Sequence, residues 1–384
     1  MTAGGMTRRS LLAATAGAMA GGLARPGGAL ALTAPTALAQ ATPELQAGPG
    51  QPPVVARRVW AQESSHPRVA PEYGSVKLAF VHHTENPNGY SAGEVPAMLR
   101  AIFLFHRDVH GWNDIGYNFV IDRFGRIFEA RAGGIDEPVI GAQAGGYNYC
   151  STGIAVLGEY GAQRISPVAR AALARLLAWK LALHGVPIEG RVTVRVNPAG
   201  AVYSRFPANA HVSLPRIAGH RDADSTECPG NAFYGELSGL RAICARLQGR
   251  PVRATIALAS QGVPGGETRA LTGSLMLLGG GVQETPVPGA PIAIQARSVS
   301  RRGEVVQERT IAEAVTNAEG KWSLPATFPG VAAGTQLWLR ALCPGASGVG
   351  AAVSDPLRVS VAAPVTPPPV APAPTPEAAV PPAP

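Results

Sequence analysis

Residues 77–84 read Lys-Leu-Ala-Phe-Val-His-His-Thr, a short apolar run that leads directly into two histidines. A run of this length predicts a buried strand over Lys77–Val81 that ends at His82. Side chains from distant segments converge at strand ends. A lone histidine beside a strand is most often a polar residue with its hydrogen bonds satisfied and not a metal ligand. His82 is therefore a candidate ligand only if other ligand residues lie near it.

Two later segments supply such residues. They are Gly219-His220-Arg221-Asp222 and Glu227-Cys228-Pro229-Gly230. Zinc accepts imidazole nitrogen and thiolate sulfur, and three protein ligands leave a fourth tetrahedral position open for the water of a hydrolytic site. Cys228 follows His220 in a polar loop bent by Pro and Gly, which lets both reach one point. The sequence therefore predicts one Zn²⁺ held by His82, His220 and Cys228.

The chemistry of such a site needs further groups. A bound zinc lowers the pKa of its water toward ~7 and polarises the attacked carbonyl. Tyr117 is the candidate that donates to the developing oxyanion or gives a proton to the leaving amine; the alternative is a strand tyrosine packed in the sheet. Thr226 adds a hydroxyl two residues before Cys228. Glu227 is a further candidate base, although loop neighbours often point apart.

Strand and helix patterns alternate through residues 57–249, which predicts an α/β domain with one mixed sheet flanked by about three helices. The expected elements are a helix from the capping-box residues Ser91–Glu94 to near Gly111, a hairpin of Tyr117–Asp122 with Arg126–Ala130, a strand over Gly153–Leu157, a helix from Ser166-Pro167 to Gly185, an extra hairpin or a loop excursion over Arg191–Pro215, and a helix capped by Asn231.

The sequence pattern changes after Arg250-Pro251, where helical periodicity stops and short β-type runs begin. Short β-type runs separated by turns predict an all-β, immunoglobulin-like sandwich over residues 252–362. It would bind a polymer, space the first domain from a surface or only stabilise that domain. The runs are Thr255–Ala259, Leu271–Leu278, Pro291–Val299, Val305–Ile311, Lys321–Ala326, Gln336–Cys343 and Leu357–Val361. Residues 363–384 are almost all Pro, Ala and Val, and we expect an extended tail.

The N-terminus has the pattern of an export signal over residues 1–39. Thr7-Arg8-Arg9-Ser10-Leu11-Leu12 is a twin-arginine pattern, a weakly apolar stretch follows, and Ala37-Leu38-Ala39 offers a cleavage site. Residues 40–56 are expected to form a flexible leader. No later segment is apolar enough to span a bilayer. These features predict an exported protein, periplasmic, wall-associated or extracellular, and not an integral membrane protein once the signal is removed.

Charge and cysteine content limit the partners. The formal net charge is +8, and no basic stripe with interleaved aromatics suggests nucleic-acid binding. A mild positive charge suits an anionic cell wall or serves only solubility. The chain has four cysteines, and export permits disulfides. If Cys228 binds metal, at least one other is unpaired, and Cys150 with Cys244 is the pair to test first.

Five segments, taken together and in their order along the chain, indicate a protein family. They are Phe80–Thr84, Gly111–Phe119, Gly141–Asn148, Ser151–Ile154, and His220 through Gly230. Together they resemble the peptidoglycan recognition protein family, which overlaps the type 2 N-acetylmuramoyl-L-alanine amidases. The resemblance covers roughly residues 57–249.

The resemblance implies a mixed central sheet, a groove with zinc, and hydrolysis of the lactyl–L-alanine amide of peptidoglycan by a zinc-activated water. It places His82, His220 and Cys228 on the zinc ligands and Tyr117 on the catalytic tyrosine. Thr226 stands where some members carry lysine. The groove that binds the muramyl peptide would be lined by His83, Trp112, Asn113, Gln143 and Tyr147. For Trp112, Asn113 and Tyr147 the alternative is a place in the core.

Two other functions compete with this one. Some members of the family bind peptidoglycan without cutting it, typically when the cysteine ligand is replaced, and here Cys228 is present. A thiol hydrolase would use Cys228 as nucleophile and His220 as base, but it has no evident use for His82 and Tyr117.

Overall fold

The structure is a computed structural model that describes residues 45–46, 50–248, 251–263, 266–278, 284–300, 302, 305–326, 328, 335–345 and 349–361. The predicted export signal (residues 1–39) and the predicted tail (residues 363–384) lie outside the described residues.

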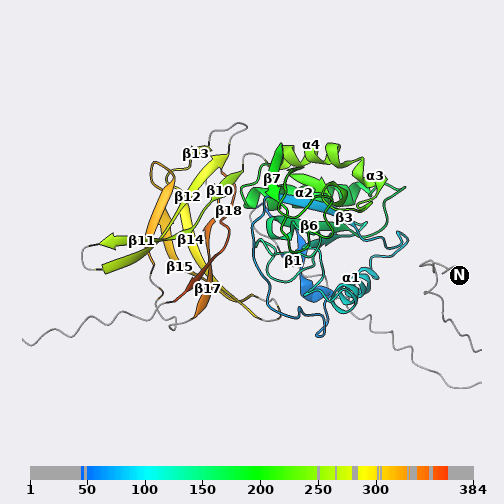
Figure 1. Ribbon diagram of the computed structural model, residues 1–384, viewed down its shortest axis with the longest axis horizontal. Coiled ribbons are helices and arrows are strands. Elements are labelled where there is room, and N and C mark those ends of the chain that lie inside the picture. The colour runs from blue at the N-terminus through cyan, green and yellow to red at the C-terminus, as the bar shows by residue number, and fades with distance from the viewer. Residues whose placement is uncertain are drawn as a thin grey trace, which may run out of the picture. The chain divides into compact units, whose positions relative to one another are not determined.

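A mixed seven-stranded sheet, in the order β1-β2-β5-β4-β6-β3-β9, forms the centre of the first part of the chain (Figure 1). Strand β3 pairs in parallel with β6 and β9, whereas β4 and β5 form the predicted antiparallel hairpin. All six residues of β3 are buried, which explains the apolar run. The strands are β1 (Leu45–Gln46), β2 (Val54–Val55), β3 (Leu78–His83), β4 (Phe119–Ile121), β5 (Ile127–Glu129), β6 (Ser151–Val156) and β9 (Ile217–Gly219).

Helices cover both faces of this sheet. Apolar residues of α2 and α4 share a core with one face, and residues of α1 share a core with the other (Figure 1). The helices are α1 (Val95–Leu104), continued by a π-helical turn (Phe105–Val109), α2 (Pro167–Leu183), α3 (Asn231–Tyr234) and α4 (Leu237–Gln248); 3-10 turns are η1 (Arg57–Val59), η3 (Asn148–Cys150) and η4 (His220–Asp222).

Helix α2 shows how local signals act. Ser166 Oγ accepts a hydrogen bond from the Ala169 N–H at 3.1 Å, and Pro167 occupies the first turn. Gly185 follows the helix with a φ of +61°, a conformation that glycine adopts at little cost. The predicted bounds of this helix are confirmed.

Two predictions about the first part are wrong. Asn231 does not cap a single helix, because Gly230 occupies the N-cap position of a short α3 that Gly235 ends before α4 begins. The flexible leader does not extend to residue 56, because β2 buries Val54 and Val55 in the sheet.

The proposed Cys150–Cys244 disulfide is also wrong, since all four cysteines are free thiols. Cys150 packs in the apolar cluster that contains Phe80. Cys244 packs with α2 in the cluster that contains Val81. Neighbouring residues of a strand face opposite sides of a sheet, so the sheet separates the two thiols.

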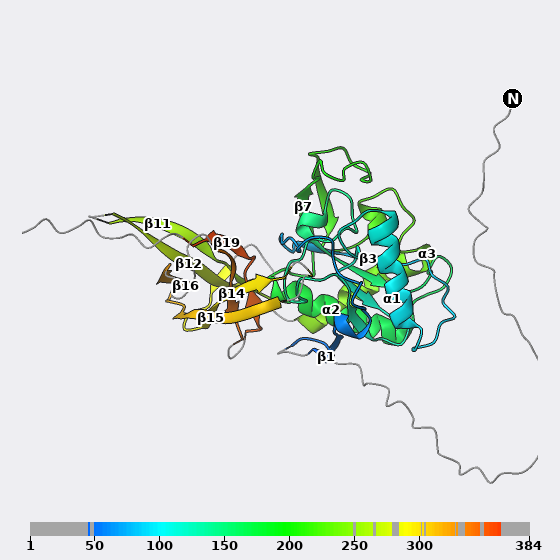
Figure 2. The same cartoon turned by 90° about the horizontal axis from the view of Figure 1, so that it is seen from below.

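The hairpin excursion is confirmed as an antiparallel pair of β7 (Arg191–Arg195) and β8 (His211–Pro215), in register from Arg191 with Pro215 to Arg195 with His211. Figure 2 shows β7 standing out from the central sheet.

The second part is all-β. Its described residues form two antiparallel sheets around one apolar core that includes Ile294, Trp322 and Leu339, as the β-sandwich prediction requires; the immunoglobulin-like character stays a prediction. The strands are β10 (Val252–Ala254), β11 (Ala257–Val263), β12 (Gly266–Leu278), β13 (Glu284–Pro286), β14 (Pro291–Val299), β15 (Val305–Val315), β16 (Lys321–Pro325), β17 (Gln336–Cys343), β18 (Ala352–Val353) and β19 (Leu357–Ser360). Within the described ranges, no helix has the length and apolar content that a bilayer crossing requires.

Candidate metal centre

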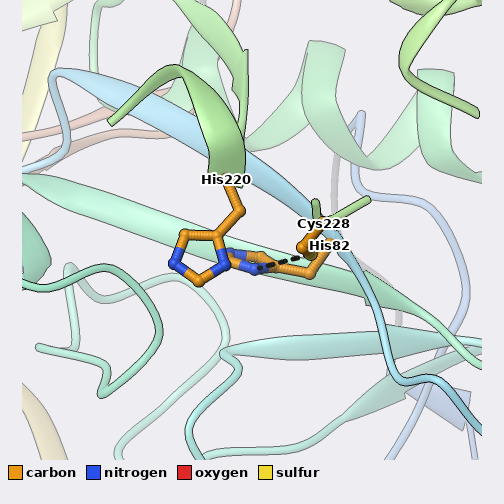
Figure 3. Close-up of side chains that lie close together, drawn as sticks. All are labelled: His82, His220 and Cys228. Carbon is orange, nitrogen blue, oxygen red and sulfur yellow. Dashed lines mark hydrogen bonds between the residues drawn. The ribbon is translucent and has the colours of Figure 1, made fainter. Parts of the chain in front are cut away.

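Two imidazoles and one thiol meet at the end of β3 (Figure 3). His82 comes from β3, His220 begins η4 directly after the neighbouring strand β9, and Cys228 lies in the loop that follows. One candidate ligand atom from each lies within 4.8 Å of the others, and Cys228 Sγ is 3.7 Å from His82 Nδ1. Tetrahedral zinc with ordinary bond lengths separates sulfur and nitrogen ligands by about 3.6 Å. The donor set and its spacing therefore fit zinc.

The ring of His82 is oriented by a chain of hydrogen bonds. Ser151 Oγ donates to the Tyr147 carbonyl, so it accepts from Gln143 Nε2 at 2.9 Å. The Gln143 Oε1 atom then faces His82 Nε2 at 2.6 Å and accepts its proton. This assignment leaves the Nδ1 lone pair of His82 toward Cys228. Burial, and then the nearby His220, hold the pKa of His82 well below its ordinary value, which provides the neutral imidazole that a metal requires.

The ring of His220 is oriented by a carboxylate. His220 Nε2 lies 3.0 Å from Asp224 Oδ2, and the same oxygen accepts a hydrogen bond from the Gly145 N–H at 2.7 Å. An ionised carboxylate only accepts, so the proton of His220 sits on Nε2 and its Nδ1 is available. Both histidines thus offer the same ring nitrogen.

Cys228 is 6 % exposed. Its backbone N–H donates to Thr226 Oγ1 at 3.2 Å. Burial raises the pKa of the Cys228 thiol to about 12, so the thiol stays protonated at neutral pH unless a cation is bound. A coordinating metal ion deprotonates such a thiol.

Two of the three candidate ligands, His220 and Cys228, line a groove of about 440 Å³, and the third, His82, is buried beside them at 1 % exposure. The groove lining also includes Tyr117 and Thr226, together with Glu85 and Phe105. The rings of Tyr117 and His82 are 5.3 Å apart. Burial raises the pKa of Tyr117, so its phenol remains a hydrogen-bond donor across the neutral range. The groove therefore brings together a metal site and a proton donor.

Among the other residues singled out from the sequence, His83 lines the groove. It is 5 % exposed, its Nδ1 accepts from the Tyr160 N–H at 3.3 Å, and its Nε2 lies 3.4 Å from Glu85. Glu227 lies outside the groove lining. Its side chain is 89 % exposed and 3.6 Å from Arg221, so the structure does not aim it at the site.

The remaining candidates make internal contacts. Trp112 stacks on His110 with ring centroids 4.9 Å apart. Both ends of the Asn113 amide bond to the backbone of Val69. Tyr147 is fully buried, and its hydroxyl lies 3.0 Å from Ser204 Oγ. None of Trp112, Asn113, Gln143 and Tyr147 is among the residues that line the groove.

Sequence reasoning missed Asp224 and Glu85, and it did not foresee the contact of Gln143 with His82. Asp224 is four residues after His220 in a segment that forms a turn, so an acid at that spacing was an available signal. Gln143 is 61 residues from His82 in the chain, and no local pattern indicates that contact.

Comparisons with known proteins find relatives for the part of the chain that contains these residues. A family model described as N-acetylmuramoyl-L-alanine amidase matches residues 72–231. Peptidoglycan-recognition protein SC2 of Drosophila simulans is 30% identical over 162 residues, which are 42% of this chain and 72% of that protein. Human N-acetylmuramoyl-L-alanine amidase is 29% identical over 203 residues, 49% of this chain and 30% of that one. The solved structure of Drosophila PGRP-LB covers 48% of this chain and 92% of its own, at 26% identity and a TM-score of 0.37.

Proposed function

The chain belongs to the family of N-acetylmuramoyl-L-alanine amidases and peptidoglycan-recognition proteins, and from this premise we propose that it is a zinc-dependent amidase. Its substrate would be the muramyl peptide of peptidoglycan, cut at the amide between the lactyl group of N-acetylmuramic acid and L-alanine. One observation carries the proposal: the candidate ligand atoms of His82, His220 and Cys228 lie within 4.8 Å of one another, at a groove lined by His220, Cys228 and Tyr117.

The side chains divide the work. When bound, zinc supplies a Lewis acid that lowers the pKa of water and polarises a carbonyl. Tyr117 donates its phenol hydrogen to the oxygen that gains charge in the transition state, or passes a proton to the leaving amine. Thr226 accepts from the Cys228 N–H, so it fastens the ligand loop and has its own hydroxyl hydrogen left to donate.

Recognition without cleavage is the second candidate, because the relative with 30% identity bears the name of a recognition protein. The intact set of three ligands beside a protonated tyrosine favours catalysis. The thiol-hydrolase alternative is weaker, since burial raises the pKa of Cys228 to about 12 and a thiol nucleophile needs a depressed value.

The finer assignments belong to the same proposal. His83 and Glu85 would contact the substrate from the groove, and Gln143 would act on His82 rather than on substrate. The protein would work in the periplasm, at the wall or outside the cell, where peptidoglycan lies. The β-sandwich over residues 252–362 would contact wall polymer or hold the amidase part, residues 57–249, at the surface.

The test is digestion of purified cell wall by the mature protein, with and without a chelator, followed by mass spectrometry of the released fragments. We expect stem peptides with a free L-alanine amino group, no release after chelation, and recovery when zinc is returned. Wall binding with no release under any condition would identify a recognition module. Release that survives chelation and stops on alkylation would identify a thiol enzyme.

The ligand assignment is tested by zinc content. His82→Ala, His220→Ala and Cys228→Ala should each lose the bound equivalent. Cys150→Ala is the matched control, because Cys150 is also a buried free thiol but lies outside the groove lining; this variant should keep its zinc. Full zinc content in any of the first three would show that the ligand set is wrong.

A further inference from the structure

Asp224 is a buried acid that no step of the proposed reaction uses. It is 4 % exposed, and it is not among the residues that line the groove. Its Oδ2 faces His220 Nε2 at 3.0 Å, whereas its Oδ1 is buried and accepts no hydrogen bond from any described residue. A buried carboxylate with an unsatisfied oxygen is destabilising unless positive charge lies close to it. An imidazole bound to a cation, held against the other oxygen, supplies such charge.

The position of Asp224 is set by segments far from it in the chain. The Gly145 N–H donates to Oδ2 at 2.7 Å, and residue 224 forms a β-bridge with Ser204 in the loop between β7 and β8. The Arg205 N–H donates to the Ala223 carbonyl at 2.9 Å. The tip of the hairpin is therefore bonded to the turn that carries His220.

Gly145 packs closely against the tip of the hairpin. A Cβ atom on Gly145 would lie 2.5 Å from the Gly200 carbonyl oxygen and 2.6 Å from Tyr203 Cβ. Tyr147, two residues after Gly145, extends its hydroxyl to 3.0 Å from Ser204 Oγ. The donor to Asp224 and the hairpin tip thus form one packed unit.

We propose that Asp224 is a positioning residue for metal binding, and that the β7–β8 hairpin belongs to the metal site because it holds Asp224 against His220. The inference rests on the proposed zinc site and deepens it. A carboxylate on Nε2 keeps the proton there, turns the Nδ1 lone pair toward the metal and raises the basicity of the ring. His82 has a neutral amide in the same place, so the charged partner acts on His220 alone.

The test measures the zinc dissociation constant of the full chain by competition with a chromophoric chelator. Asp224→Ala should weaken zinc binding by about 10–100-fold. Asp224→Asn keeps an oxygen acceptor without the charge and should lose less. Asp222→Asn is the matched control: its carboxylate bonds to the Gly219 N–H at 2.9 Å and to the Tyr234 hydroxyl at 2.5 Å, not to an imidazole. This variant should keep the wild-type constant.

A second readout does not depend on zinc. Long-range proton–nitrogen NMR correlations of the metal-free protein should show His220 with its proton on Nε2, and Asp224→Ala should release the ring to a mixture of tautomers. Unchanged zinc affinity and an unchanged tautomer in both Asp224 variants would overturn the inference and leave the amidase proposal standing. An equal loss of affinity in Asp222→Asn would overturn it as well, because the effect would then be disruption of the loop.

The role of Asp224 can also be tested if the amidase proposal fails. If the wild-type protein takes up no zinc, the proposed function fails. The tautomer measurement then still decides whether Asp224 orients His220: a fixed Nε2–H ring that depends on Asp224 supports the orientation, and a mixture in the wild type refutes it.

Discussion

The substitution Gly153→Ala tests the orientation of His82 without changing any candidate metal ligand. Gly153 lies in β6 with an extended strand backbone, so alanine suits its conformation. A Cβ atom there would lie 2.3 Å from Gln143 Cγ and 2.6 Å from Gln143 Cδ. Ordinary contact begins at 3.4 Å, so the Gln143 side chain must move by about 1 Å. A shift of that size breaks hydrogen bonds that now measure 2.6 Å to His82 and 2.9 Å to Ser151.

The expected size of the effect of Gly153→Ala follows from the role of Gln143, which orients the His82 ring. Loss of a partner that orients a metal ligand weakens metal binding by about 10–100-fold, which is about 1.4–2.7 kcal/mol. Overpacking of a buried site lowers the free energy of unfolding by about 1–3 kcal/mol. Gly153→Ala should therefore show both effects, in a zinc competition titration and in urea unfolding of the metal-free protein.

A double-mutant cycle isolates the cause. Gln143→Ala removes the hydrogen bond to His82, so this variant should itself weaken zinc binding. It also removes the side chain that the new Cβ would strike, so adding Gly153→Ala should then change zinc affinity little. The reasoning is refuted if Gly153→Ala reduces zinc affinity by the same factor with and without Gln143, because the effect would not pass through that side chain.

Three further variants probe chemistry, pH dependence and stability. Tyr117→Phe should keep a full equivalent of zinc and slow wall hydrolysis by about 10²–10³-fold in a turnover assay; unchanged turnover would remove Tyr117 from the mechanism. Burial, and then His110, lower the pKa of His106 to about 4, and its Nδ1 accepts from the Gly116 N–H. His106 therefore takes up its proton at a higher pH in the unfolded chain than in the folded protein, and its contribution to the free energy of unfolding should fall by about 3 kcal/mol between pH 6.5 and pH 4. In His106→Asn, urea titrations should show a smaller fall; equal slopes would contradict the argument. Ser166→Ala should lower the free energy of unfolding by about 1 kcal/mol through loss of the cap on α2, and a change below the error of the titration would show that the cap contributes nothing.

The elements that the sequence predicted well carry their signals locally. The bounds of α2 follow from Ser166, Pro167 and Gly185, all at or next to its ends, and the apolar run before His82 has the length of a buried strand. The prediction of one third helix was wrong because the apolar spacing that indicated it starts at Leu237, whereas residues 231–234 form a separate short helix that Gly235 ends. The suggested disulfide failed because cysteine count carries no information about which face of a sheet each thiol occupies.

For the site, the sequence alone determined the kinds of atom available: two imidazoles, one thiol, one phenol, and a loop short enough to join His220 to Cys228. Only the tertiary structure decided which nitrogen of each ring faces the candidate metal site, because that choice rests on Gln143 and Asp224. Gln143 reaches His82 through the pairing of β3 with β6, and Asp224 is held through the hairpin. A hydrogen bond acts over about 3 Å, and chain folding alone brings residues so distant in sequence within that range.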